Sequence, residues 1–287
     1  MEISQPIVST FIAGLAIAWL TGCSTVSETG RSQLSLVSDA EVESMAVSQF
    51  DQMKHEMPIA NDPAKQQALR RVGEKIVRAA RAQGADLLPP EQWEFVLFDS
   101  DQVNAFAMPG GKVGFYTGIF PLFQSDDDIA VVMGHEIAHV SADHGAEKVS
   151  QQMANQVAGT ALSIGLGVGG VEHDTQQIVM ASYGMGSNFG FILPFSRTME
   201  SEADHIGLLY SSTAGYDPRA SVPFWQRMAA NGGERPPEFL STHPSENTRI
   251  ARLQELIPEM LPLYYKASGQ TQNEWLGPVA PHYAMND

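Results

Sequence analysis

Two stretches in the first third of the chain predict helices, and the second of them carries apolar residues at helical spacing. The first opens at Ser38, where Glu41 three residues later completes the pattern of a capping box. The second runs from Asp62 to about Gln83, with an apolar stripe that recurs every three or four residues. The glycine at 84 and the prolines at 89–90 are expected to end this helical unit.

A third helix is predicted after Ser125. The Ser125 hydroxyl can cap its first turn, and the three aspartates at 126–128 suit the positive end of a helix. We expect this helix to continue past His144 to about Ala154. Later helices are expected at residues 196–211, 218–230 and 245–256.

Short runs rich in aromatic and β-branched residues predict a small sheet between these helices. Residues 93–98 (WEFVLF) are typical of a strand. Residues 104–108 and 112–116 flank Pro109-Gly110-Gly111 as the two arms of a hairpin flank its turn. The pattern as a whole therefore predicts an α+β fold that is mainly α-helical, with a small sheet beside the helix after Ser125.

Residues 159–190 have an unusual composition. They are rich in Gly, Ser, Ala and Met, and only Glu172 and Asp174 carry charge. This composition predicts two small helices joined by a mobile apolar junction. A membrane span is the alternative, but the glycines and the polar run 173–177 interrupt it.

The first residues of the chain have the pattern of an export signal. Thr10–Leu20 is an apolar run too short to span a bilayer comfortably, and residues 20–23 (LTGC) follow it directly. This sequence resembles a bacterial lipobox, in which the signal is cleaved before a cysteine that becomes lipid-modified. Residues 1–9 include Glu2 and neither Lys nor Arg, although export signals normally begin with positive charge. The alternative is a short buried or anchoring helix with an incidental cysteine.

The composition excludes several classes of function. The chain has 33 acidic and 17 basic residues and a formal net charge of −16, so it offers no basic patch for nucleic acid. Cys23 is the only cysteine, which excludes an internal disulfide and a zinc site of several thiolates. Apolar residues make up 43% of the chain, enough for a sizeable core.

The helix after Ser125 contains the pattern H-E-x-x-H at residues 135–139. Residues four apart on a helix share one face, so His135 and His139 can bind one metal ion. Glu136 lies one step round the helix, where its carboxylate can reach a water beside that metal. Two neutral imidazoles and a neighbouring base are parts of a hydrolytic zinc site.

A catalytic zinc needs a third protein ligand, and three layouts can be compared with the chain. The metzincin layout requires Gly and His where this chain has Ala142 and Gly145. A thermolysin-like glutamate would fall near Gly159, and none is there. The third layout places a glutamate on a later helix and an aspartate four residues after it, and Glu200 and Asp204 fit this layout.

These motifs together resemble the HtpX, BepA and LoiP group of gluzincin zinc metallopeptidases, peptidase family 48, which includes the CAAX prenyl protease type. The resemblance covers about residues 40–255 and implies the gluzincin metallopeptidase fold. Without the spanning helices of HtpX or the repeat domain of BepA, the chain is most similar to the soluble periplasmic branch and closest in layout to LoiP. The matching motifs are HEIAH at 135–139, ESEAD at 200–204, THP at 242–244 with Arg249-Ile250, and NAFAMPGGKV at 104–113.

The lipobox-like sequence also implies a division of the chain and its place in the cell. Lipidation at Cys23 is expected to attach the protein to the bacterial cell envelope, and by resemblance to enterobacterial lipoproteins Ser24 in the next position favours the periplasmic face of the outer membrane. The predicted segments are a signal peptide at 1–22, a tether at 23–37, a zinc metallopeptidase domain at 38–264 and a C-terminal tail at 265–287.

The resemblance assigns a role to each matching residue. His135 and His139 bind one zinc ion per chain through neutral imidazoles, and Glu200 supplies the third ligand. Glu136 is the general base that takes a proton from the attacking water and returns it to the leaving amine. Asp204 lies one turn after Glu200 and holds a ligand histidine by its other N–H. The resemblance favours His135 as that histidine, although the residues alone do not choose between the two.

Two later residues complete the predicted site. In the family, a histidine at the place of His243 either stabilises the oxyanion as a catalytic group or binds zinc as an inhibitory fourth ligand, and both roles stay open. The Gly- and Pro-rich segment 232–243 predicts a gate that moves His243 on and off the zinc site. Arg249 is expected to pair with a carboxylate near the site.

His144, His205 and Glu202 lie off the ligand face. We therefore expect none of them to be a ligand, and we expect Glu202 to be at the surface.

The predicted function is zinc-dependent hydrolysis of peptide bonds in unfolded or misassembled envelope proteins. Gluzincins hold a peptide as an added strand on a sheet edge, and strand 112–116 or its hairpin partner is the candidate. The expected partners are unfolded or misfolded protein substrates and a membrane reached through the N-terminal lipid anchor, with no nucleic acid. The alternative is a zinc-containing lipoprotein that acts as a chaperone-like or scaffold factor with a silenced site.

Overall fold

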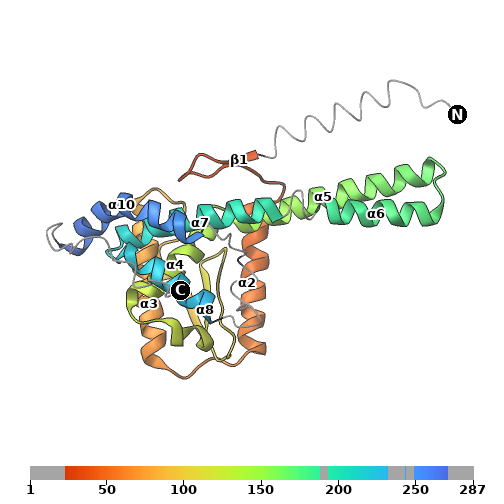
Figure 1. Cartoon of the computed structure of the whole chain (residues 1–287). Coiled ribbons are helices and arrows are strands. Elements are labelled where there is room, and N and C mark those ends of the chain that lie inside the picture. The colour runs from red at the N-terminus through yellow and green to blue at the C-terminus, as the bar shows by residue number, and fades with distance from the viewer. Residues whose placement is uncertain (1–22, 188–192, 232–242, 244–248, 271–287) are drawn as a thin grey trace, which may run out of the picture. The chain divides into compact units, whose positions relative to one another are not determined.

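The computed structural model describes residues 23–187, 193–231, 243 and 249–270 (Figure 1). Helices dominate, with two small sheets, which confirms the predicted mainly helical α+β fold. In chain order the elements are β1 (Cys23–Thr25), β2 (Ser32–Leu34), α2 (Asp39–Glu56), α3 (Pro63–Ala82), η1 (Pro90–Gln92), β3 (Glu94–Phe98), β4 (Ala105–Met108), β5 (Lys112–Tyr116), η2 (Thr117–Leu122), α4 (Asp126–Ser141), α5 (His144–Val168), α6 (His173–Ser187), α7 (Leu193–Thr213), η4 (Pro218–Ala220), α8 (Ser221–Ala230) and α10 (Arg249–Ser268).

The described residues divide into two compact units. The first unit draws on residues 1–42 and 143–194, and the second unit draws on residues 43–142 and 195–287. All the residues predicted for the zinc site belong to the second unit. The predicted segment bounds stay predictions, and the signal peptide at 1–22 and most of the C-terminal tail lie outside the described residues.

Two helices begin with the caps that the sequence predicts. The backbone N–H of Ser38 donates to the Glu41 carboxylate at 3.3 Å, and the backbone N–H of Glu41 donates to the Ser38 hydroxyl at 3.3 Å. The Ser125 hydroxyl accepts a hydrogen bond from the backbone N–H of Asp127 at 3.2 Å. Each cap satisfies an N–H that the first helical turn leaves without a partner inside the helix.

The three-stranded sheet has the order β3-β5-β4. Strands β3 and β5 run parallel, and β4 pairs with β5 in the antiparallel sense. Gly110 and Gly111 make the predicted turn between β4 and β5 with φ angles of 78° and 68°, values that glycine adopts without strain. Among the described residues β5 is the central strand and its hairpin partner β4 is an edge strand, so of these two candidates β4 is the one that offers an edge for the predicted pairing with a peptide.

Helix α4 lies in the middle of the second unit. Its residues are buried without interruption from Asp128 to Ala138, and both α3 and β4 pack against it. An apolar cluster beside the sheet joins Phe50 of α2 to Phe98 and Tyr116 of the strands. The helix that carries the H-E-x-x-H motif is therefore held on several sides.

The predicted extension of this helix past His144 is wrong. Helix α4 ends at Ser141, and α5 starts afresh at His144. Asp143 between them has the left-handed conformation, with φ 51° and ψ 30°. A left-handed residue breaks the ladder of helical hydrogen bonds, and Asp is among the residues that tolerate this conformation.

The last helix is longer than predicted. Helix α10 continues to Ser268 through Pro258 and Pro262, both of which are exposed. Proline removes one helical hydrogen bond. Leu253, Met260 and Tyr264 are buried on the other side, and this packing offsets the loss. Residues 245–248, where we expected the helix to begin, lie outside the described residues.

The first unit contains two features that differ from the predictions. The expected tether at 23–37 includes the two-stranded antiparallel sheet of β1 and β2. Two helices do occupy the range 159–190, as predicted, but the first of them is the end of the long helix α5, which starts at His144, and α6 packs against it (Figure 1). Within the described part of the chain, no helix is long and apolar enough to cross a membrane.

Candidate metal centre

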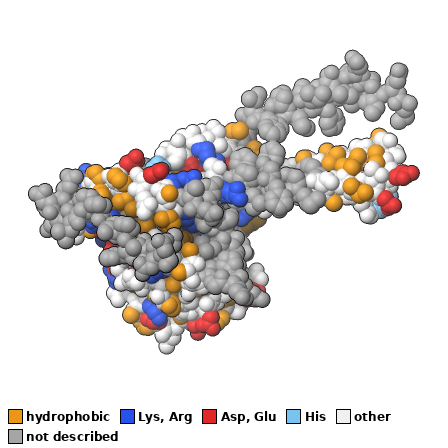
Figure 2. All heavy atoms as spheres, viewed as in Figure 1, with side chains coloured by type: hydrophobic (Ala, Val, Ile, Leu, Met, Phe, Trp, Pro, Cys, Tyr) orange, Lys and Arg blue, Asp and Glu red, His pale blue; other side chains and the backbone are white. Residues whose placement is uncertain are grey.

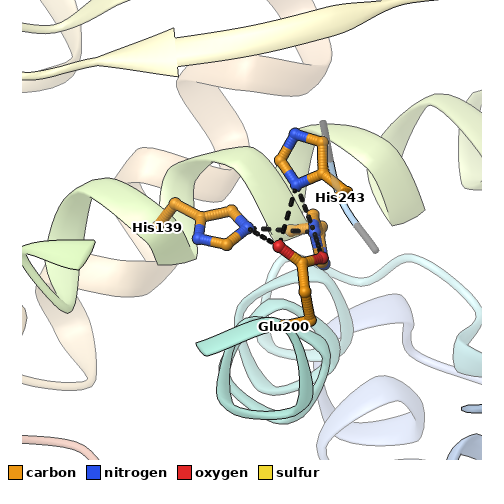
Figure 3. Close-up of side chains that lie close together, drawn as sticks. His139, Glu200 and His243 are labelled. Atoms are coloured by element: carbon orange, nitrogen blue, oxygen red, sulfur yellow. Dashed lines mark hydrogen bonds and ion pairs between the residues drawn. The ribbon is translucent and has the colours of Figure 1, made fainter. Parts of the chain in front are cut away.

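Four side chains converge in the second unit on a space the size of a single ion. They are His135 and His139 from α4, Glu200 from α7, and His243. Figure 3 shows how the side chains of His139, Glu200 and His243 face one another. One nitrogen or oxygen atom from each lies within 4.8 Å of the others. The structure thus brings the two histidines of the motif together with Glu200, as predicted from the sequence, and adds His243 beside them.

The separations between these atoms match a tetrahedral zinc site. The His135 Nε2 atom is 3.1 Å from His139 Nε2, 3.4 Å from His243 Nδ1 and 3.2 Å from Glu200 Oε2. Glu200 Oε1 is 3.4 Å from His139 Nε2 and 3.2 Å from His243 Nδ1. Ligand atoms about 2.0–2.1 Å from a tetrahedral zinc ion lie about 3.3 Å from each other. The donor set therefore fits zinc, with His243 at the fourth corner.

Asp204 fixes the orientation of the His135 ring. His135 Nδ1 donates to Asp204 Oδ1 at 3.0 Å, which leaves Nε2 to face the other ligand atoms. The Arg249 guanidinium donates to the same Asp204 oxygen. Burial alone would raise the pKa of Asp204, but Arg249 and His135 hold that pKa below its usual value. Asp204 therefore remains a carboxylate that accepts the proton of His135 Nδ1 and fixes the tautomer.

Trp225 of α8 supports this arrangement from one side. The guanidinium carbon of Arg249 lies 3.4 Å from the centre of the Trp225 ring, which is the geometry of a cation–π contact. The ring of His135 meets Trp225 at 5.9 Å between centroids. Sequence reasoning missed Trp225, because nothing in the local pattern of α8 distinguishes it from an ordinary core tryptophan.

His135 and Glu200 hold each other in their charged forms. Burial alone lowers the pKa of His135, but its hydrogen bonds to Asp204 and Glu200 outweigh burial and raise that pKa to about 9. Burial alone would raise the pKa of Glu200, but His139, His135 and His243 hold it well below its usual range. Glu200 is therefore an anion at neutral pH, and a metal ion that binds His135 must displace a proton.

Glu136 lies next to the ligand cluster rather than inside it. Its Oε2 atom accepts a hydrogen bond from the backbone N–H of Ala107 in β4 at 3.2 Å. Its Oε1 atom is buried without a hydrogen-bond partner and lies 3.5 Å from His243 Nε2. Burial raises the pKa of Glu136, although the neighbouring histidines and the Ala107 N–H lower it in part. A buried carboxylate with one unsatisfied oxygen is well suited to accept a proton.

The charges of the site favour a divalent cation. Glu136, Glu200 and Asp204 are all buried, and Arg249 is a buried cation beside Asp204. When all three carboxylates are ionised, Arg249 balances one of them and a dication balances the other two. Buried charge is costly unless it is paired, so this donor set is more stable with a metal ion than without one.

Two glycines set the distance between the ligand-bearing helices. A side-chain carbon at Gly207 of α7 would lie 2.7 Å from the backbone nitrogen of His135. A side-chain carbon at Gly134 of α4 would lie 2.7 Å from the backbone oxygen of Gly207. The two backbones cross in contact here, beside His135 and one turn after Asp204. Sequence reasoning did not identify either glycine, because a glycine within a helix gives no sign of what lies opposite.

The remaining candidates lie outside the cluster. Among the described residues, His144 begins α5 and His205 lies on α7, and neither joins the ligand atoms. Glu202 does not join them either, but it is buried and not at the surface as we predicted. The segment 232–242 of the predicted gate lies outside the described residues.

Comparison with known protein families gives one match that covers more than half of the chain. The sequence model of Peptidase family M48 matches residues 63–257. This range includes α3, the three-stranded sheet, α4, α7 and the first part of α10, and therefore every member of the ligand cluster.

Individual relatives agree with this match. The chain is 38% identical over 170 residues to the mitochondrial metalloendopeptidase OMA1 of Schizosaccharomyces pombe, over 58% of this chain and 48% of the relative. It is 30% identical over 255 residues to the mitochondrial metalloendopeptidase OMA1 of Bos taurus, over 88% and 47%. It is 28% identical over 277 residues to the beta-barrel assembly-enhancing protease of Escherichia coli O157:H7, over 93% and 55%. The chain spans about half the length of these relatives.

Proposed function

Because the chain belongs to peptidase family M48, we propose that it is a zinc-dependent endopeptidase whose metal is held by His135, His139 and Glu200. The observation that carries the proposal is the set of 3.1–3.4 Å separations between His135 Nε2 and the facing atoms of His139, Glu200 and His243. Zinc supplies the Lewis acidity that activates water and polarises a peptide carbonyl at such sites.

Each of the other residues has a task in peptide hydrolysis. Glu136 accepts a proton from the attacking water through its unsatisfied Oε1 atom and returns it to the leaving amine. Ala107 donates to the other oxygen of Glu136 and keeps the carboxylate in place. Asp204 holds His135 in the tautomer that presents Nε2, and Arg249 holds Asp204.

The outer edge of β4 is the proposed place for the substrate. Strand β4 packs against α4, and the Ala107 N–H on its outer edge reaches Glu136. A peptide that adds to this edge as a further strand would pass beside the general base. Pairing through main-chain hydrogen bonds needs an extended chain but little particular sequence. We therefore propose unfolded or misassembled proteins as substrates.

The metal requirement tests this function directly. Treatment with a zinc chelator is expected to abolish cleavage of denatured casein, and one equivalent of zinc per chain is expected to restore it, because His135, His139 and Glu200 form one site. The measurement is casein cleavage alongside elemental analysis of the same samples. Cleavage by a sample shown to contain no metal would contradict the proposal.

His243 is proposed to close the site in the arrangement seen here. Its Nδ1 atom takes the fourth corner of the ligand set, and its Nε2 atom lies 3.5 Å from Glu136. A fourth protein ligand excludes the water that a catalytic zinc needs. Of the two roles left open by the sequence, the inhibitory ligand agrees better with this geometry.

Replacement of His243 with alanine is therefore expected to raise casein cleavage and to weaken zinc binding by roughly tenfold, because one of four ligands is lost. Activity and zinc affinity are measured by casein cleavage and by competition with a chromogenic chelator. His205→Ala, on α7 but outside the cluster, is the control and should change neither value. A fall in cleavage with unchanged zinc affinity would instead support oxyanion stabilisation, and no change in either value would exclude the gate.

The closed geometry also supports a second function. If His243 never leaves the fourth corner, the protein is a zinc-containing lipoprotein that acts as a chaperone-like or scaffold factor. Both functions require zinc, but only the peptidase requires a proton acceptor at Glu136.

We further propose that the protein works at the bacterial cell envelope, attached through a lipid on Cys23 on the periplasmic face of the outer membrane. Three observations support this location: the lipobox-like sequence at 20–23, the exposed position of Cys23 and the similarity to an Escherichia coli protease named for β-barrel assembly. Protein quality control is the corresponding role. Other similar proteins are named as mitochondrial, so the location needs its own test.

Mass spectrometry of the N-terminus provides that test. The protein isolated from bacterial membranes is expected to begin at a lipid-modified Cys23, because signal cleavage precedes the cysteine of a lipobox. Replacement of Cys23 with serine should leave an unmodified residue at this position. A mature chain that retains residues 1–22 would exclude lipidation at Cys23.

A further inference from the structure

The helical hairpin of α5 and α6 in the first unit exposes an apolar stripe. On α5, Met153, Val157, Ile164 and Val168 have exposed fractions of 43%, 68%, 62% and 81%. Their spacings of four, seven and four residues place them on one face of a helix. Ile178 on α6 is exposed by a further 67%. Figure 2 shows apolar side chains on the surface of this hairpin.

This hairpin is almost without charge. Between Lys148 and Arg197 the sequence contains no lysine or arginine, and its acidic residues there are Glu172 and Asp174. Both acids lie close to the turn between the helices, away from the middle of the stripe. A partner that covers the stripe therefore needs apolar surface and no complementary charge, which is a property of the lipid hydrocarbon boundary.

The same unit ties this hairpin to the N-terminal segment. Arg31, from the turn between β1 and β2, donates to both oxygens of the buried Glu147 carboxylate in the first turn of α5, at 3.0 Å and 2.7 Å. The backbone N–H of Leu36 donates to the Ser150 hydroxyl at 2.8 Å. Cys23 begins β1. An attachment that holds Cys23 at a membrane therefore also holds the first turns of α5 near that membrane.

We propose that the apolar stripe of α5 lies in the interface of the phospholipid bilayer to which the N-terminal segment is attached. The hairpin and the lipid attachment at Cys23, where β1 begins, then form two membrane contacts within one unit. Two weak contacts in one unit bind more firmly than either alone, because the second forms at high effective concentration. The proposal rests on the proposed envelope location for the presence of the bilayer, but not on peptidase activity.

Depth-dependent fluorescence tests this contact in the full chain. A fluorophore is placed on Val157→Cys, Ile164→Cys and Val168→Cys, one at a time, and the protein is reconstituted into phosphatidylcholine vesicles that contain nitroxide-labelled lipid. Met45→Cys on α2, where Met45 is 57% exposed, is the matched control. Each variant is labelled after Cys23 has been lipid-modified, so that one thiol reacts and the attachment is kept.

We expect quenching by nitroxide lipid at the three stripe positions to be roughly twofold or more that at Met45. Because the stripe has no charge, quenching should be the same in vesicles with added phosphatidylglycerol and should not change with salt. Ile164→Glu combined with Val168→Glu should lower quenching at Val157→Cys to the level of the control and leave casein cleavage unchanged.

Three results would overturn the proposal, and each has a separate meaning. Attached protein with stripe positions quenched no more than Met45 shows that the hairpin stays in water. A blue shift that depends on protein concentration and needs no vesicles shows that a second copy covers the stripe. Protein that does not bind vesicles at all contradicts the envelope location itself, whereas lost casein cleavage with intact quenching contradicts only the peptidase function.

Discussion

Replacement of Glu136 with glutamine is expected to lower kcat/KM for denatured casein by about one hundred- to ten thousand-fold while zinc content and fold are retained. Glutamine keeps the size of the side chain, and its amide oxygen can still accept the Ala107 N–H. It cannot accept a proton from the attacking water, and this proton transfer is what a general base contributes to the rate. A neutral amide is also less costly to bury than a carboxylate, so the substitution should not lower the stability of the folded state.

The control for this substitution is Glu94→Gln. Glu94 on β3 binds Lys54 and Lys112 and lies outside the ligand cluster, so its loss should leave cleavage nearly unchanged. Casein cleavage, elemental analysis and thermal unfolding are measured on both variants. Unchanged cleavage by Glu136→Gln would exclude the base. If the unsubstituted protein itself does not cleave casein and remains zinc-bound, the scaffold function is favoured instead.

Replacement of Gly207 with alanine is expected to weaken zinc binding by roughly ten- to a hundredfold and to lower the free energy of unfolding by about 1–3 kcal/mol. The added carbon would lie 2.7 Å from the His135 nitrogen and 2.8 Å from the Gly134 carbonyl carbon, so α4 and α7 must move apart. The movement separates the histidines on α4 from Glu200 and Asp204 on α7. Alanine favours a helix over glycine by up to about 1 kcal/mol, which offsets part of the loss.

Gly165→Ala on α5 is the matched control, because a side-chain carbon there meets nothing within 4 Å. This variant should be as stable as the parent protein or slightly more stable, with unchanged zinc affinity. Chelator competition and denaturant unfolding are the measurements. Normal zinc affinity in Gly207→Ala would show that the crossing of the two backbones does not determine the geometry of the site.

Local patterns predicted much of the secondary structure. The caps at Ser38 and Ser125 and the Gly110-Gly111 turn depend on residues a few positions apart, and all three occur in the structure. The predicted helix from Asp62 agrees with α3 for the same reason. Interactions of this range are visible in the sequence because the chain itself keeps the partners near each other.

Other elements depended on surroundings that no local pattern contains. The break after α4 rests on one left-handed residue, Asp143, and the extension of α10 through Pro258 and Pro262 rests on what Met260 and Tyr264 pack against. The buried position of Glu202 could not be predicted either, since it depends on what surrounds α7. Tertiary packing decides such cases because it outweighs the small local preferences of single residues.

The sequence by itself determined which chemistry was available. The four-residue spacing of His135 and His139 on a helix, with Glu136 between them, places two imidazoles on one face and a carboxylate beside them wherever the helix lies. Comparison of known layouts then selected Glu200 and Asp204. Only the tertiary structure decided how these parts meet: the contact of Gly134 with Gly207, the outer edge of β4 and the position of His243 at the fourth corner. Ligand distances of a few ångströms between separate helices depend on how backbones pack, and that packing is a property of the whole fold.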